Sequence, residues 1–221
     1  MAKLPSAGGG LSPSSRPTLA IFGGSFDPVH NGHLFVASEV VRAELAEEVM
    51  FVPARRPPHK TDRRLSAAAD RLSMLNAALA PFPEFSCSDI ELTREDGLSY
   101  TFDTLETLNQ AFPERELLFL LGMDNLVSLH TWHRAPELVQ KYRLIVYPRG
   151  RVVTPSFAEL AGHFGDRHAR RLLAAVINLQ LIPVRGSDIR ADCALGRNLA
   201  GRIPESVLGY IRDHGLYASR P

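Results

Sequence analysis

The sequence is poor in cysteine and contains no long apolar run. Its two cysteines, Cys87 and Cys193, lie far apart and outside any CxxC pair. This spacing argues against a disulfide framework or a zinc site and fits a reducing cytoplasm. No apolar run approaches the roughly 20 residues of a membrane-spanning helix. Residues 1–17 are rich in Gly, Ser and Pro and lack the apolar block of a signal peptide. We therefore expect a cytoplasmic protein with a flexible tail at 1–17.

An excess of charge of one sign is also missing. The chain has 25 Lys and Arg residues against 24 Asp and Glu residues, which gives a formal net charge of +1. Strong binding to duplex nucleic acid or to an anionic membrane draws on a broad positive field, so this balance argues against both as main partners. A local basic pocket for a small polyanion remains compatible with it.

What the sequence does contain is an alternation of short apolar runs with amphipathic segments. This alternation predicts βαβ units and a mostly parallel sheet. The expected strands cover 19–22, 49–53, 85–92, 117–121, 143–147 and 179–184, and the expected helices cover 33–45, 66–79, 101–112, 135–141, 157–177 with a break near Gly165, 188–195 and 204–214. We predict a doubly wound, Rossmann-like α/β domain at 18–185, followed by a small C-terminal helical subdomain at 186–221.

The stretch GGSFDPVHNGH, residues 23–33, directly follows the first expected strand. It indicates a tight glycine turn that opens a helix, a place where backbone N–H groups bind anions. His30 and His33 are three residues apart, so they share one face of the first helical turn. The alternative is an ordinary strand-to-helix turn in which the histidines cap the helix at the protein surface. The combination of turn and two imidazoles favours a phosphate-binding site.

Three further loops are expected at the same edge of the sheet, because parallel strands end there together. They contain the sequences PPHK at 57–60, GMDN at 122–125 and GSDIR at 186–190. The last again combines small residues, a hydroxyl, a cation and a helix start. Two anion-binding elements on one edge suggest a long anion such as a nucleoside triphosphate.

Together these segments resemble a known family. GGSFDPVHNGH resembles the HxGH motif of the nucleotidyltransferase superfamily. The PPHK loop, Ser99-Tyr100-Thr101 before a helix, GMDNL with Trp132 after it, a terminal S-x-I-R and the ending Gly215-Leu216-Tyr217 are similar to bacterial nicotinate-nucleotide adenylyltransferases. The resemblance covers residues 18–217.

The resemblance implies an activity. Members of this family join nicotinate mononucleotide to the AMP moiety of ATP, which gives nicotinate adenine dinucleotide and pyrophosphate in NAD biosynthesis. The mononucleotide phosphate attacks the α-phosphorus in line with the leaving group. Because the sequence has no Ser-His-Asp or Cys-His arrangement that demands a covalent intermediate, positioning and charge neutralisation are expected to supply the catalysis. Mg²⁺ would accompany ATP, and a homo-oligomer is allowed.

The resemblance also implies residue roles. His30, His33 and Arg190 would act on the phosphates during catalysis. The remaining ATP-binding residues would be Gly23, Gly24, Ser25, Phe26, Lys60, Gly122, Asp124 and Ser187, and the residues for the second substrate would be Tyr100, Thr101, Trp132 and Arg149. Some have structural alternatives: Trp132 as core, Asp124 as a helix cap and Lys60 as surface charge.

Two features depart from the family pattern. Arg185-Gly186 stands where serines are usual, and Pro148-Arg149-Gly150 replaces Arg-Pro-Gly, which affects the alignment of Arg149. Three other interpretations stay open: another adenylyl- or cytidylyltransferase, a preference for the nicotinamide mononucleotide, and a non-catalytic nucleotide-binding module.

Overall fold

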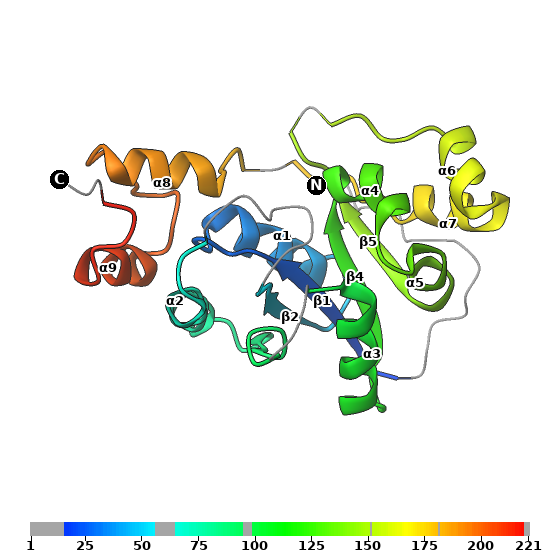
Figure 1. Cartoon of the computed structure of the whole chain (residues 1–221), viewed down its shortest axis with the longest axis horizontal. Coiled ribbons are helices and arrows are strands. Elements are labelled where there is room, and N and C mark those ends of the chain that lie inside the picture. Colours follow the sequence, from blue (N-terminus) through cyan, green and yellow to red (C-terminus); the bar gives the residue numbers. More distant parts are fainter. Residues whose placement is uncertain (1–15, 56–64, 95–98, 151, 181, 219–221) are drawn as a thin grey trace. The chain divides into compact units, whose positions relative to one another are not determined.

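A computed structural model of the chain describes residues 16–55, 65–94, 99–150, 152–180 and 182–218. Its strands form one sheet in the order β3-β2-β1-β4-β5, made of β1 (Thr18–Gly24), β2 (Glu48–Pro53), β3 (Phe85–Cys87), β4 (Glu116–Gly122) and β5 (Arg143–Tyr147). β4 pairs in parallel with β1 and with β5. The chain steps outward from β1 to β3 and then resumes on the other side of β1 (Figure 1). The predicted doubly wound α/β fold is confirmed.

The two central strands are buried almost throughout, which explains their uninterrupted apolar sequences. Ala20 of β1 stands opposite Leu118 of β4, and both are 0% exposed. A parallel strand that is covered on both faces has no solvent side, so apolar residues run continuously instead of alternating with polar ones.

The helices lie close to the predicted ranges. They are α1 (Asn31–Arg42), α2 (Ala68–Leu79), α3 (Thr101–Ala111), α4 (Met123–Ser128), α5 (Ala135–Lys141), α6 (Phe157–Phe164), α7 (Asp166–Ala174), α8 (Gly186–Ala194) and α9 (Glu205–Asp213), with a short 3-10 turn η2 (Leu129–Thr131). Gly165, at φ 78°, separates α6 from α7, so the predicted break is confirmed. α4 and η2 were not predicted, because GMDNL carries loop-like polar residues in place of a long amphipathic pattern.

Two predicted strands need correction. The strand expected at 85–92 ends at Cys87, because the chain then turns, with the Leu92 N–H donating to the Asp89 carbonyl at 2.7 Å. The described residues of 179–184 form no strand. Pro183 has no N–H for a ladder, and the nearby pairing with β5 is limited to a single bridge between Val146 and Val176.

The chain divides into two compact units. The first comprises Met1–Phe22, Glu39–Val49 and Tyr100–Leu181, and the second comprises Gly23–Ser38, Met50–Ser99 and Ile182–Pro221. Within the second unit, α9 lies beside α2 (Figure 1): Tyr210 donates to Asp70 at 3.0 Å and Ser206 to the Ala77 carbonyl at 2.9 Å. The predicted boundaries at residues 18 and 186 stay predictions, and residues 1–15 of the predicted tail lie outside the described residues.

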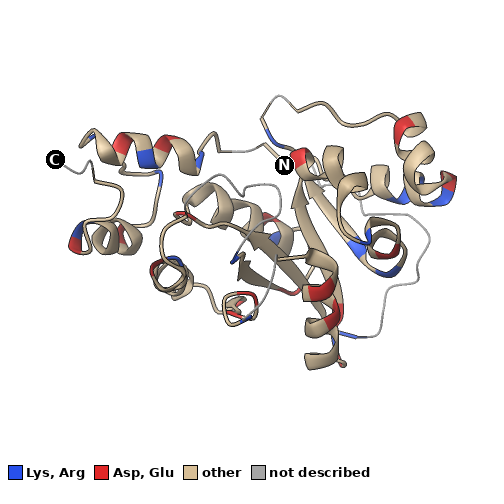
Figure 2. Ribbon diagram, in the orientation of Figure 1, with Lys and Arg blue, Asp and Glu red and all other residues tan. Residues whose placement is uncertain are grey.

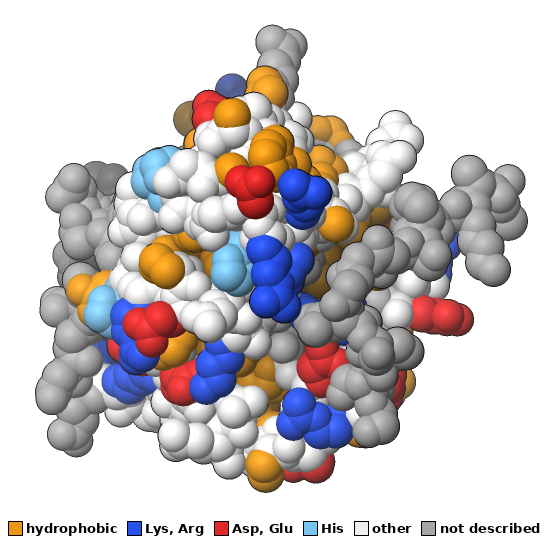
Figure 3. Space-filling view, turned by 90° about the vertical axis from the view of Figure 1, so that its right-hand side faces the viewer, with side chains coloured by type: hydrophobic (Ala, Val, Ile, Leu, Met, Phe, Trp, Pro, Cys, Tyr) orange, Lys and Arg blue, Asp and Glu red, His pale blue; other side chains and the backbone are white. Residues whose placement is uncertain are grey.

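Charges of both signs are interspersed on the described elements. On α8, for example, Asp188, Arg190 and Asp192 alternate in sign (Figure 2). The face drawn in Figure 3 likewise mixes basic and acidic side chains. In the described part of the chain, no helix combines the length and the apolar character that crossing a membrane requires.

Candidate active site

The end of β1 and the turn that follows it, residues 23–30, which we call the glycine turn, are shaped by a buried phenylalanine. Phe26 is 2% exposed, has a positive φ of 43° and packs against Phe51 with ring centroids 5.4 Å apart. A Cβ on Gly24 would come within 3.0 Å of the Phe26 ring. A glycine at this position therefore lets Phe26 fold back under the turn. The hydroxyl of Ser25 is buried and has no hydrogen-bond partner among the described residues.

His30 and His33 lie together where α1 begins. Their rings stack with centroids 3.6 Å apart, His30 is 5% exposed and His33 is half-buried. The His30 backbone N–H donates to Nδ1 of His33 at 3.3 Å. Because Nδ1 accepts this hydrogen bond, a neutral His33 carries its proton on Nε2 and can donate it to an anion. The prediction that the two histidines share one face is confirmed.

The glycine between the two histidines leaves room for the first of them. A Cβ on Gly32 would lie 3.1 Å from Nδ1 and 3.2 Å from Cε1 of His30. We expect Gly32→Ala to lower turnover at least about tenfold by displacing the His30 ring. The free energy of unfolding should change little, since alanine's helix propensity, worth ~1 kcal/mol over glycine, offsets the crowding.

Gly209→Ala is the matched control for this substitution. Gly209 lies in α9 and has no atom within 4 Å of an added Cβ, so this variant should keep full turnover. Initial rates and urea unfolding measure both effects. Full turnover in Gly32→Ala would show that the exact place of the His30 ring is not needed.

Helix α8 brings a cation to the glycine turn. Arg190 donates from Nη1 to the Asp27 carbonyl at 2.5 Å. Gly186 lies against the same contact, because a Cβ there would be 3.3 Å from both the Asp27 carbonyl oxygen and Nη1 of Arg190. Ser187 is exposed at the start of the helix. The structure thus joins the first and fourth predicted loops within one unit.

A buried arginine supports the turn from beneath. Arg71 of α2 is 2% exposed and donates to the carbonyls of Ser25, Ala54 and Ser66 at 2.9, 2.8 and 3.2 Å. Burial lowers the pKa of its guanidinium, and the nearby Asp27 carboxylate opposes this shift. Arg71 therefore ties the glycine turn to the end of β2.

A second group of predicted residues lies in the other unit, at the start of α3. Tyr100 is the residue before the helix, and its ring lies 4.5 Å from that of His133. Nε2 of His133 approaches Asp103 at 4.0 Å, and Trp132 packs edge-on against Phe119 at 6.1 Å. His133, the chain neighbour of Trp132, therefore lies beside Tyr100 at the start of α3.

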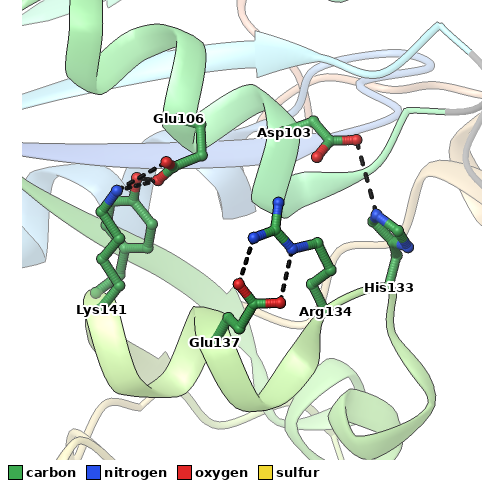
Figure 4. A network of polar contacts seen from close by, with 7 residues as sticks. Asp103, Glu106, His133, Arg134, Glu137 and Lys141 are labelled. Atoms are coloured by element: carbon green, nitrogen blue, oxygen red, sulfur yellow. Dashed lines mark hydrogen bonds and ion pairs between the residues drawn. The ribbon is translucent and has the colours of Figure 1, made fainter.

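Polar contacts between α3 and α5 hold this second group in place (Figure 4). Lys141 and Tyr142 both donate to Glu106, at 2.7 and 2.5 Å. Burial opposes ionisation of Glu106, but these hydrogen bonds outweigh it and lower its pKa. Arg134 pairs with Glu137 and stacks over the Phe102 ring at 3.9 Å. The turn carrying Trp132 is therefore anchored on α3.

Three side chains meet at the ends of β4 and β5. Nε of Arg149 lies 3.5 Å from Oδ2 of Asp124, and Nη1 of Arg149 donates to the Tyr147 hydroxyl at 3.2 Å. Burial raises the pKa of Tyr147. A Cβ on Gly122 would come within 2.6 Å of Oδ1 of Asp124. The structure therefore brings together Gly122, Asp124 and Arg149.

Comparison with known proteins identifies the family of this chain. A family model described as Cytidylyltransferase-like matches residues 21–192. A Dehalococcoides mccartyi protein named as a probable nicotinate-nucleotide adenylyltransferase is 39% identical over 200 residues, which cover 89% of this chain and 95% of the relative. A Thermomicrobium roseum protein of the same name is 40% identical over 201 residues, covering 90% and 91%. This chain belongs to the nicotinate-nucleotide adenylyltransferase family.

Solved structures share the fold of this family member. A Plasmodium falciparum nicotinic acid mononucleotide adenylyltransferase complexed with NaAD superposes with a TM-score of 0.71 at 20% identity, over 91% of this chain and 97% of that one. A structure of the Plasmodium protein complexed with APC gives a TM-score of 0.69 at 20% identity, with the same coverage.

The departures from the adenylyltransferase pattern can now be placed. Gly186 occupies a close contact that a serine side chain would crowd, while Arg185 is exposed. Arg149 contacts Asp124 and Tyr147, so the order Pro-Arg-Gly still puts a guanidinium beside β4. Lys60 lies outside the described residues.

Sequence reasoning gave no role to several residues that the structure places at these clusters: Asp27, Arg71, His133, Tyr147 and Tyr217, whose hydroxyl donates to Asp27. Arg71 carried a usable signal, because it is a charged residue on the same helix face as Met74, Leu75 and Ala78, all of them buried. Tyr217 belongs to the family-like ending, which the resemblance noted without giving it a role.

Proposed function

We propose that this chain joins nicotinate mononucleotide to the adenylyl group of ATP and releases pyrophosphate and nicotinate adenine dinucleotide. The observation that carries the proposal is the second unit's anion site. Stacked His30 and His33 lie at a helix start, and Arg190 is attached to the same turn through the Asp27 carbonyl. Three N–H-bearing side chains at one turn, two from the start of α1 and one from α8, suit a polyphosphate.

In this proposal the turn binds ATP. The backbone of Gly23, Gly24 and Phe26 approaches the nucleotide, and the buried Ser25 hydroxyl gains an acceptor. His33 donates from Nε2 to a phosphate oxygen, and His30 stacks behind it. Charge builds up on the transferring phosphate and on the leaving pyrophosphate, where fixed donors stabilise the transition state more than the ground state.

Arg190 and Ser187 hold phosphate oxygens from α8, and Lys60 is proposed as a further phosphate contact. Arg190 donates one of the five N–H groups of its guanidinium to the Asp27 carbonyl, which places the cation at this turn. Gly122 and Asp124 are assigned to the nucleotide sugar.

A divalent cation accompanies ATP as part of the substrate, and we propose Mg²⁺. This ion is bound mainly by phosphate oxygens and water. Among the described residues, no group of three or more His, Cys, Asp or Glu side chains is arranged to hold a metal. A cytoplasmic location and a homo-oligomer stay predictions.

The acceptor is assigned to the first unit's residues. Backbone N–H groups of Tyr100 and Thr101 at the start of α3 receive the nicotinate carboxylate, Trp132 stacks on the pyridine ring, and Arg149 contributes a cation. The mononucleotide phosphate then attacks the α-phosphorus directly, without a covalent enzyme intermediate.

The test is pyrophosphate release from ATP and Mg²⁺, with nicotinate mononucleotide and nicotinamide mononucleotide compared side by side. We expect pyrophosphate release to be at least about tenfold faster with the nicotinate compound, because backbone N–H groups bind a charged carboxylate more strongly than a neutral amide. Reactions lacking either acceptor serve as the blank. ATP binding without release from either compound would contradict the proposed function.

A further inference from the structure

The C-terminal turn of the chain reaches the glycine turn that the mechanism uses. The hydroxyl of Tyr217 donates to Oδ1 of Asp27 at 2.6 Å, across 190 residues of sequence. Asp27 is 5% exposed and Tyr217 is half-buried, so this hydrogen bond is partly shielded from water. Tyr217 has no part in the chemistry proposed above.

Asp27 accepts hydrogen bonds from both Tyr217 and Arg190. Its side chain accepts from Tyr217, while its backbone carbonyl accepts from Nη1 of Arg190 at 2.5 Å. The neighbouring Ser25 carbonyl accepts from Arg71 at 2.9 Å. Asp27 is therefore held at its side chain by Tyr217 and at its carbonyl by Arg190, so one residue connects the two.

The position of Tyr217 is determined by its own surroundings. After α9 ends, Gly215 and Tyr217 take positive φ angles of 59° and 61°. The Leu216 N–H donates to the Ile211 carbonyl at 2.9 Å, and Sγ of Cys193 to the Leu216 carbonyl at 3.5 Å. Burial and the hydrogen bond to Asp27 raise the pKa of Tyr217, which keeps its hydroxyl a proton donor at neutral pH.

We infer that Tyr217 is a positioning residue for ATP. We call residues 214–217 the C-terminal latch. The latch holds Asp27 in place, so that Arg190 and the two histidines face one polyphosphate together. This inference rests on the proposed function. It assigns the latch to the ATP side of the reaction, because Tyr217, Asp27 and Arg190 all belong to the second unit.

The experiment compares Tyr217→Phe with Tyr210→Phe. Each variant removes one hydroxyl that hydrogen-bonds an aspartate, but the Tyr210 hydroxyl donates to Asp70 of α2 and the Tyr217 hydroxyl to Asp27 of the glycine turn. We expect Tyr217→Phe to lower kcat/KM for ATP about tenfold, the effect of losing a hydrogen bond to a charged group, and to leave KM for nicotinate mononucleotide unchanged. Tyr210→Phe should lower the thermal midpoint without changing either kinetic constant.

The outcomes separate the latch from plain stability. Wild-type kinetics in Tyr217→Phe would overturn the inference. It would also be overturned if Tyr217→Phe and Tyr210→Phe changed the KM for ATP and the KM for nicotinate mononucleotide by the same factors. Binding of α,β-methylene ATP, measured by calorimetry, tests the latch without an acceptor: about tenfold weaker binding in Tyr217→Phe supports it, and unchanged binding overturns it. If the wild type releases no pyrophosphate, the proposed function fails, and this binding comparison still decides on the latch.

Discussion

His33→Ala is expected to fold normally and to lose turnover by about 10²–10³-fold, the usual effect of removing one donor from a transition-state charge site. In the proposed function Nε2 of His33 is the phosphate donor, because Nδ1 accepts from the His30 backbone N–H. Alanine removes both functions of the ring. The loss of the local hydrogen bond should cost about 1 kcal/mol of the free energy of unfolding, as for other helix caps. Pyrophosphate release and circular dichroism measure the two effects.

His33→Asn separates capping from phosphate donation. The Oδ1 of asparagine can take the place of Nδ1 and accept from His30, but its side chain is too short to reach where Nε2 lies. We expect wild-type stability with the same low turnover as His33→Ala. Exposed His163 of α6 offers the control His163→Ala, with unchanged turnover. Near-normal turnover in His33→Asn would refute the phosphate role of His33.

Arg71→Met is expected to lower the free energy of unfolding by about 3 kcal/mol. Methionine fills much of the space, but it leaves the partly buried carbonyls of Ser25 and Ala54 without the donor that Arg71 supplies. These carbonyls belong to the glycine turn and to the end of β2. Urea unfolding measures the loss, and KM for ATP should rise as the turn loosens.

Arg42→Met is the control for Arg71→Met. The side chain of Arg42 is 67% exposed and pairs with Glu39 on the surface of α1, so its removal should leave stability almost unchanged. Equal stability of Arg71→Met and the wild type would mean that water replaces the arginine at no cost, and Arg71 would not be a support of the site.

Local features of the site could be predicted from the sequence because they depend on near neighbours. The placing of His30 and His33 on one face follows from helical spacing, and the break at Gly165 follows from the residue itself. The strand and helix alternation predicted a doubly wound sheet for the same reason, since each element carries its own pattern of apolar residues.

Only the tertiary structure decided which distant residues support that site. Every residue has a backbone carbonyl, so nothing in the sequence marked those of Ser25 and Ala54 as partners of Arg71. Nothing marked the Asp27 carboxylate as the acceptor of Tyr217 either, because the two residues are 190 positions apart. The predicted strand at 179–184 was wrong for a related reason. An apolar run becomes a strand only where it pairs along a neighbouring strand, and the pairing beside β5 is limited to a single bridge at Val176. The sequence by itself determined the two histidines and the turn that presents them. The fold determined the buried cation beneath that turn and the C-terminal latch on it, because both arise from contacts between segments that chain spacing leaves far apart.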